Sequence, residues 1–229
     1  MALSEQETLR PLSAGVREDL ETATAAYQAA LSTDWSVLAK LDERGLDPEV
    51  VASARLGVVA DPEPGHHAFK GFLAIPYLDR HGQPLQLRFR CLQDHDHRAY
   101  GHGKYMTISG DPARTYNVGA IHAAARDDEA IHICEGELDA VILSKLGLHA
   151  IAIPGAAGWN PRHRRMLAGF NDVFVWPDRD EAGDKFAAAV MRSLYAALRV
   201  KLPYGDVGEV FVKEGPEALL AALEGVRGR

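Results

Sequence analysis

Four carboxylates follow apolar segments of the chain and could together hold a divalent cation: Glu135, Asp139, Asp178 and Asp180. The first two come after residues 131–134, and the other two come after residues 173–176. Both segments have the apolar, β-branched or aromatic composition of buried strands. Carboxylates gathered at neighbouring strand ends repel one another, and a hard cation such as Mg²⁺ relieves that repulsion. The pattern therefore predicts a metal site.

The elements that position these acids can also be predicted. Residues 131–143 begin as a strand pattern, turn at Gly136 and continue with helical periodicity. Glycine lets the backbone reverse without a Cβ clash. Residues 149–154 form a third strand pattern, and the loop at Gly155 can approach a phosphate closely. Open α/β sheets bind ligands at the carboxyl ends of their strands, where these residues stand.

This order of motifs resembles a known family. A strand ending in Glu135-Gly136-x-x-Asp139, followed by a strand ending in Asp178-x-Asp180-x-Ala-Gly, is similar to the Toprim domain. Bacterial-type primases, type IA and II topoisomerases and some nucleases share that domain. The match covers about residues 129–215. An ordinary α/β domain with surface acids at its strand ends is the alternative.

A basic hairpin precedes this region. Residues 71–78 and 84–91 are strand patterns separated by turn chemistry, and Arg88 and Arg90 project from one face because they are two residues apart. Residues 64–120 hold seven Lys or Arg against four Asp or Glu, whereas the whole chain has a net charge of −7. A basic surface facing a polyanion explains this local balance, and a solvated hairpin face is the alternative.

The resemblance extends into this hairpin. In bacterial-type primases a strand ending in Arg is followed, across a variable loop, by Lys-Tyr, and here Arg90 is followed by Lys104-Tyr105. The similarity then covers about residues 35–215. It implies an α/β fold, with a Toprim domain of Rossmann-like parallel sheet preceded by a small mixed helical and β-rich subdomain. The expected boundaries are an N-terminal helical extension over 1–33, the basic subdomain over 34–120 and the Toprim domain over 121–229.

The loop after the hairpin carries four further metal-ligand types: Cys91, His95, His97 and His102. Their spacing is not a standard zinc pattern, and the loop also carries acids that suit a solvated surface. No structural zinc is therefore expected.

Near the C-terminus two further elements are predicted. A long helix begins beside the second acidic cluster, and its Lys185 could face a bound triphosphate or pair with Asp180 or Glu181. Residues 200–202 and 207–212 are expected to be closing strands.

Bulk properties narrow the class of protein. The chain has 229 residues, 47% hydrophobic and 25% charged, and its two cysteines lack CxxC spacing. Neither a membrane-length apolar run nor a signal peptide is present in the sequence, so no membrane partner is expected. We expect a protein of the cytoplasm of a bacterial cell or a phage-infected host.

The resemblance implies the catalytic core of a DNA primase, a nucleotidyltransferase that makes short RNA primers from NTPs on a single-stranded DNA template during replication. Glu135, Asp178 and Asp180 would be catalytic, and together with Asp139 they would hold Mg²⁺ or Mn²⁺. The residues expected to bind template or triphosphate are Arg88, Arg90, Lys104, Tyr105 and Lys185.

Other functions stay open at this point. A Toprim-type nuclease would use the same acids to cut a strand, and an accessory subunit would bind single-stranded DNA without catalysis. A topoisomerase needs a tyrosine nucleophile, for which no tyrosine here has a suggestive context. Residues 1–33 hold neither Cys nor His, and the chain has no GxxxxGK[ST] loop. Bacterial-type primases commonly carry a zinc-ribbon and a helicase or helicase-binding domain, so the resemblance implies a replicative helicase and a separate zinc-ribbon module as partners.

Overall fold

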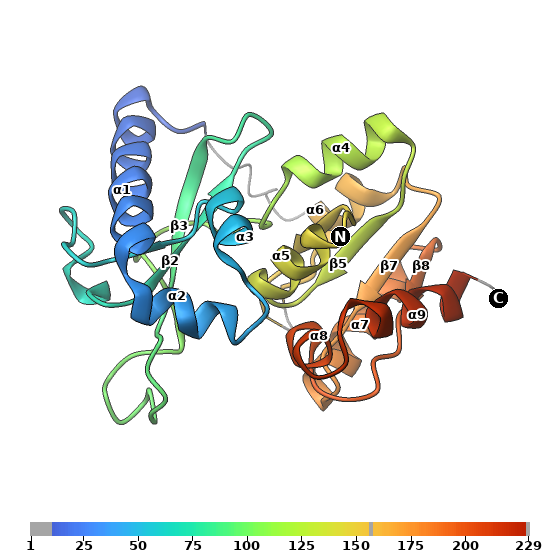
Figure 1. The fold of residues 1–229 in the computed structure, drawn as a ribbon. Helices are drawn as coiled ribbons and strands as arrows, with labels where there is room; N and C mark the ends of the chain where they lie inside the picture. Colours follow the sequence, from blue (N-terminus) through green and yellow to red (C-terminus); the bar gives the residue numbers. More distant parts are fainter. Residues whose placement is uncertain (1–10, 156–157, 228–229) are drawn as a thin grey trace.

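The computed structural model describes residues 11–155 and 158–227, and these form two subdomains that each contain a four-stranded sheet (Figure 1). The antiparallel subdomain runs from α1 to β4, and the parallel subdomain runs from α4 to α9. This arrangement confirms the predicted α/β class, with a parallel sheet preceded by a mixed helical and β-rich unit. Within the described ranges, no helix has the length and apolar character to cross a membrane.

The antiparallel subdomain starts with three helices whose first turns are capped by side chains. They are α1 (Ala14–Thr33), α2 (Trp35–Asp42) and α3 (Pro48–Ser53). Ser13, Asp34 and Asp47 each accept a hydrogen bond from a backbone N–H three residues later. Such caps satisfy donors that the helix cannot pair internally. Residues 1–10 of the predicted N-terminal extension lie outside the described ranges, and the boundaries after residues 33 and 120 stay predictions.

The sheet of this subdomain has the order β1-β2-β3-β4 and is antiparallel throughout. Its strands are β1 (Gly57–Val58), β2 (Leu73–Leu78), β3 (Pro84–Arg90) and β4 (Tyr105–Thr107), with the short helix η1 (His67–Phe69) before β2. Leu87 and Phe89 of β3 are fully buried in a cluster with Tyr27 of α1. Side chains alternate along a strand, so the intervening arginines of β3 point to the other face.

The parallel subdomain has the strand order β6-β5-β7-β8. Its strands are β5 (Ile131–Cys134), β6 (Ala150–Ala152), β7 (Val173–Trp176) and β8 (Ala197–Arg199). The helices are α4 (Gly119–Asp127), α5 (Glu137–Lys145), α6 (Pro161–Leu167), α7 (Glu181–Ser193), α8 (Val207–Glu214) and α9 (Pro216–Arg227). One face of the sheet packs against α5, α8 and α9, and the other packs against α4, α6 and α7. All neighbouring strands of this sheet pair in parallel, so the four strands end at the same edge.

Two predictions about the C-terminal region are wrong. Residues 207–212 belong to helix α8, because the Asp206 side chain accepts a hydrogen bond from the Glu209 N–H and caps the helix. Its buried residues, Val207 and Val210, are three apart, which is helical spacing. The last strand of the described chain is β8, which ends directly before the predicted segment 200–202. Because α7 ends at Ser193, the chain has room for β8 to extend the parallel sheet.

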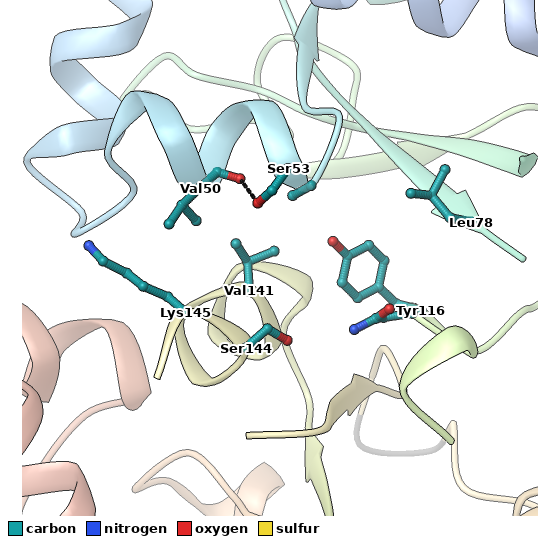
Figure 2. A pocket seen from close by; sticks show the side chains of 9 residues that line it. Val50, Ser53, Leu78, Tyr116, Val141, Ser144 and Lys145 are labelled. Atoms are coloured by element: carbon teal, nitrogen blue, oxygen red, sulfur yellow. Dashed lines mark hydrogen bonds between the residues drawn. The ribbon is translucent and has the colours of Figure 1, made fainter. Parts of the chain in front are cut away.

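The seam between the subdomains is apolar and tied at several points. One buried cluster continues from Leu41 and Ile75 to Val141 of α5. Beside it lies a cavity of about 180 Å³, in which Val50 and Ser53 of α3 face Val141 of α5 (Figure 2). Lys145 of α5 pairs with Asp47 at 2.8 Å across the seam. This packing holds the two subdomains in a fixed relation, on which the cleft described next depends.

Candidate active site

A cleft of about 600 Å³ opens where the two subdomains meet. Its acidic wall comes from the parallel subdomain and consists of Glu135, Asp139, Asp178 and Asp206. Its basic wall comes from the antiparallel subdomain and consists of Arg88, Arg90, Lys104 and Tyr105. The cleft also receives Arg44, Gly155, Glu209 and Lys213. The fold thus places opposite charges on facing surfaces at the carboxyl edge of the parallel sheet.

Glu135 stands at the end of β5 and is half-buried. Its Oε1 atom is buried and has no hydrogen-bond partner among the described residues. Burial, followed by the nearby charge of Asp178, raises the pKa of Glu135 to about 7. A carboxylate oxygen that is withdrawn from water and left unpaired is costly unless a ligand, such as a cation, satisfies it.

Asp139 lies on the first turn of α5, and Gly136 allows it to pack closely. A Cβ added to Gly136 would lie 2.4 Å from the Asp139 carboxylate, so any other residue would displace it. The Asp139 Oδ1 atom accepts a hydrogen bond from the Gly208 N–H at 3.0 Å. Burial raises the pKa of Asp139 well above its ordinary value, and Asp206 and Asp178 raise it further.

Asp178 follows β7, across from Glu135. Burial, followed by the charges of Asp206 and Asp180, raises its pKa to about 6. Lys104 of the basic wall lowers the same pKa, which places the two walls within electrostatic reach of each other. Three members of the acidic wall thus hold protons more tightly than free carboxyl groups do.

Asp206 completes the acidic wall and is absent from the residues predicted from the sequence. Its carboxylate caps α8 by accepting from the Glu209 N–H at 2.7 Å, and its charge raises the pKa of both Asp139 and Asp178. Prediction of residues 207–212 as a strand concealed it, since a strand gives no reason to look for a cap. The available signal was an Asp directly before apolar residues at helical spacing.

Asp180 and Lys185 occupy more peripheral positions. Asp180 is exposed and caps α7 by accepting from the Gly183 N–H at 2.7 Å. It still raises the pKa of Glu135 and Asp178, so it lies near the acidic wall. Lys185 is exposed and pairs with Glu181 at 2.6 Å, which was the alternative to contact with triphosphate. Neither residue is part of the cleft lining within the described chain, and their predicted roles stay predictions.

Glu137 of α5 connects the parallel subdomain to the basic wall. The sequence patterns did not point to this residue. The Glu137 side chain is 2% exposed and pairs with Arg88 at 2.5 Å. It also accepts a hydrogen bond from the Tyr77 hydroxyl at 2.6 Å. Because Glu137 belongs to α5 and the other two residues belong to β2 and β3, this triad joins the subdomains at the cleft.

Arg90 and Tyr105 are members of the basic wall that contact each other. Arg90 donates to the Tyr105 hydroxyl at 3.0 Å, and the guanidinium groups of Arg88 and Arg90 lie 4.8 and 5.3 Å from the Tyr105 ring centre. Burial raises the pKa of Tyr105 to about 12, so the phenol stays neutral. Lys104 is exposed, which leaves its ammonium group available to a ligand.

Known proteins resemble this chain over the same regions. A family model described as Toprim-like matches residues 132–207, which hold all four carboxylates of the acidic wall. The gene 57 protein of Mycobacterium phage D29 is 36% identical over 160 residues, covering 68% of this chain and 99% of that protein. The chain belongs to the Toprim-like family.

Solved primase structures share the fold of this Toprim-like protein. The RNA polymerase domain of Mycobacterium tuberculosis primase DnaG, in complex with a double-stranded DNA oligomer with a 6-nucleotide overhang, matches with a TM-score of 0.76 and 18% identity. The match covers 93% of this chain and 80% of that one. A DnaG primase catalytic domain bound to single-stranded DNA matches with a TM-score of 0.67 and 20% identity, covering 92% and 78% of the two chains. The resemblance to the DnaG catalytic core is therefore established for the fold.

The acidic wall of this Toprim-like protein suits a hard divalent cation. All its donors are carboxylate oxygens, one of them buried and unpaired, and Mg²⁺ and Mn²⁺ prefer oxygen ligands. A bound cation would also lower the raised pKa values, because it favours the charged carboxylates. Glu135, Asp139 and Asp178 therefore fit the predicted metal-ligand role, which stays a prediction.

The expectation that the chain holds no structural zinc is not supported. The four side chains of the loop after β3 lie together, with one ligand atom of each within 4.8 Å of the others: Cys91, His95, His97 and His102. Unfamiliar sequence spacing led to that expectation, but spacing along a loop does not determine where its side chains meet.

Proposed function

We propose that this Toprim-like protein is a DNA primase catalytic core that makes short RNA primers on single-stranded DNA for replication. The observation that carries the proposal is the cleft itself, where an acidic wall suited to cations faces a basic wall suited to phosphates. The shared fold with DNA-bound primase structures supports the same reaction class. Template-directed joining of nucleotides requires both kinds of surface within one cleft.

The basic wall would bind phosphate groups of the template or of the incoming NTP. Lys104 is exposed at the cleft and free to move toward a ligand, whereas Arg88 is held by Glu137. Arg90 is only 7% exposed, and its guanidinium is oriented by Tyr105. A pre-oriented guanidinium loses little conformational entropy when it pairs with a phosphate, which favours accurate positioning.

The acidic wall would act where the new bond forms. A primer 3′-hydroxyl attacks the α-phosphorus of the NTP, and pyrophosphate leaves. Mg²⁺ or Mn²⁺ bound to these carboxylates would supply charge stabilisation to the attacking and leaving oxygens. Glu135, whose buried Oε1 atom has no hydrogen-bond partner among the described residues, would either hold the cation or accept the proton of the 3′-hydroxyl.

The direct test is primer synthesis. The purified chain is incubated with single-stranded DNA, labelled NTPs and Mg²⁺ or Mn²⁺, and we expect short labelled oligomers that disappear with EDTA. The Asp178→Asn variant is run in parallel to exclude a contaminating polymerase. Loss of template length without NTP incorporation would instead identify a nuclease, and template binding with neither product would identify an accessory subunit.

Partners can be tested in the same assay. A replicative helicase and a zinc-ribbon module, added separately, are expected to stimulate initiation more than extension of a pre-annealed primer. Extension bypasses the choice of a start site, so it depends less on either partner. Equal stimulation of both reactions would argue against a role of these partners in start-site choice.

A further inference from the structure

The loop between β3 and β4 gathers four side chains that the proposed reaction does not use. They are Cys91, His95, His97 and His102, and their ligand atoms all lie within 4.8 Å of one another. The Cys91 sulfur is 3.6 Å from the Nε2 atom of His95. The three imidazole rings are mutual neighbours, with ring centres between 4.7 and 5.3 Å apart.

The nitrogens of this cluster are arranged as metal ligands usually are. The Nδ1 atom of His97 is buried and has no hydrogen-bond partner among the described residues. The Nδ1 atom of His102 lies 3.0 Å from the Gly103 carbonyl oxygen, which fixes the ring and leaves Nε2 free. A backbone carbonyl on the far nitrogen is the common way in which proteins orient a metal-binding histidine.

The nearby acids do not explain the gathering of histidines. Asp94 and Asp96 are exposed, and one oxygen of Asp96 accepts from the Arg98 N–H at 3.1 Å. Neither acid forms an ion pair with a histidine of the cluster within the described chain. Three imidazoles packed together, with no ion pair to either acid among the described residues, are more easily explained by a shared ligand than by a solvated loop.

We infer that Cys91, His95, His97 and His102 form a zinc site. One thiolate and three imidazoles are the nitrogen and sulfur donors that Zn²⁺ prefers, whereas Mg²⁺ prefers oxygen. A tetrahedral zinc ion separates its donors by about 3.3–3.6 Å. The observed separations are close enough that small side-chain rotations in an exposed loop complete the site.

The zinc site would fix the basic wall of the cleft. Arg90 directly precedes Cys91, and Lys104 follows two residues after His102, so the metal ties together the two ends of the loop. The backbone already joins those ends, because the Cys91 N–H donates to the Lys104 carbonyl at 2.9 Å. His102 also packs against Phe72 with ring centres 5.2 Å apart, which attaches the site to the core of the antiparallel subdomain.

The inference can be tested on the full chain purified without a histidine tag, and it does not depend on the proposed function. After dialysis against zinc-free buffer, elemental analysis is expected to find about one zinc per chain. Replacement by Co²⁺ should give the thiolate-to-cobalt absorption of a tetrahedral site. Both signals should fall at least about tenfold in Cys91→Ser and in His97→Gln.

Two controls separate this site from others. His122→Gln changes an exposed histidine of α4 and should keep both signals, as should Asp178→Asn in the acidic wall. If Cys91→Ser fails to fold, His97→Gln serves in its place. Circular dichroism checks that His97→Gln is folded. Hydrogen exchange of residues 91–104 should rise when wild-type zinc is removed.

Three results would overturn the inference of a zinc site or its role. Zinc content near zero, together with no thiolate band when Co²⁺ is added to the folded protein, would exclude the site. An equal thiolate band in wild type and His97→Gln would exclude this ligand set. Bound zinc with unchanged exchange over residues 91–104 would exclude the role in ordering the loop.

Discussion

The two walls of the cleft are built by opposite strategies. On the acidic wall, Glu135, Asp139 and Asp178 all have raised pKa values, because burial and mutual repulsion act on them together. On the basic wall, Arg88 pairs with the buried carboxylate of Glu137, and Arg90 is oriented by Tyr105. The protein itself therefore satisfies the charges of one wall and leaves those of the other to a ligand.

This difference predicts that the basic wall supports the fold and that the acidic wall serves the proposed reaction. Removing the Arg88 charge from the basic wall should leave the buried Glu137 carboxylate without its cation and so weaken the fold. Removing a charge from the acidic wall should relieve repulsion and leave the fold intact, at the expense of function. Functional sites commonly retain such unfavourable groups, and the following predictions test the comparison in order of expected effect.

The largest effect is expected for catalysis. Asp178→Asn should lower nucleotide incorporation by at least about 1,000-fold, or about 4 kcal/mol in the barrier, because an amide is a poor ligand for a divalent cation. Asp172→Asn, at the other end of the same strand, is the matched control and should leave incorporation unchanged. Near-normal synthesis by Asp178→Asn would show that the acidic wall is not the catalytic site.

The next effect concerns the stability of the joined subdomains. Arg88→Ala leaves the Glu137 carboxylate buried without its cation, which should cost about 3 kcal/mol in the free energy of unfolding, measured with urea. Arg126→Ala removes a guanidinium that is 74% exposed, so it should change the free energy of unfolding far less than Arg88→Ala does. Adding Glu137→Gln to Arg88→Ala should recover part of the lost free energy of unfolding. If it recovers none, the unpaired Glu137 carboxylate is not the cause of the loss.

A smaller effect of opposite sign is expected on the acidic wall. The pKa of Glu135 is about 7 in the folded protein against an ordinary value of 4.5, so ionisation costs stability as the pH rises through 7. Without divalent cation, Glu135→Gln should therefore raise the free energy of unfolding at pH 8 by about 1–2 kcal/mol. The gain should shrink as the pH falls from 7 and vanish below about pH 3.5, where the carboxyl group is protonated in both the folded and unfolded states.

Added Mg²⁺ provides the control for that prediction. It should raise the melting temperature of the wild type at pH 8 more than that of Glu135→Gln, since the cation binds the charged carboxylates. If the variant is no more stable than the wild type at pH 8 in EDTA, repulsion and burial at Glu135 are not a significant cost.

The smallest effect is expected for Lys104, the exposed member of the basic wall. Lys104→Ala should weaken binding of single-stranded DNA about threefold to tenfold and reduce the slope of log affinity against log salt by about 1. Lys70→Ala, an exposed lysine of the same subdomain outside the cleft, should change neither quantity. Binding is measured by fluorescence anisotropy. Equal salt slopes for the wild type and Lys104→Ala would show that the nucleic acid does not contact Lys104.

The sequence alone determined the fold class and much of the cleft. Period-two alternation in 84–91 placed Arg88 and Arg90 on one face, and the strand ends placed Glu135 and Asp178 at one edge. These features follow from local geometry, since a strand alternates its side chains and parallel strands end together. Helices α2 and α3 begin directly after the capping residues Asp34 and Asp47, which is also a local signal.

Only the tertiary structure decided which charges are satisfied and by what. Asp206 joins the acidic wall from far along the chain, and Glu137 reaches across the seam to Arg88 and Tyr77. The loop after β3 folds back so that Cys91 meets three histidines, although the spacing of those residues suggested no site. Local sequence patterns indicate which face a side chain occupies, but contacts between elements depend on how the elements pack. For that reason the places of Asp206 and Glu137, and the meeting of Cys91 with three histidines, became visible only once the two subdomains and the loop were placed in space.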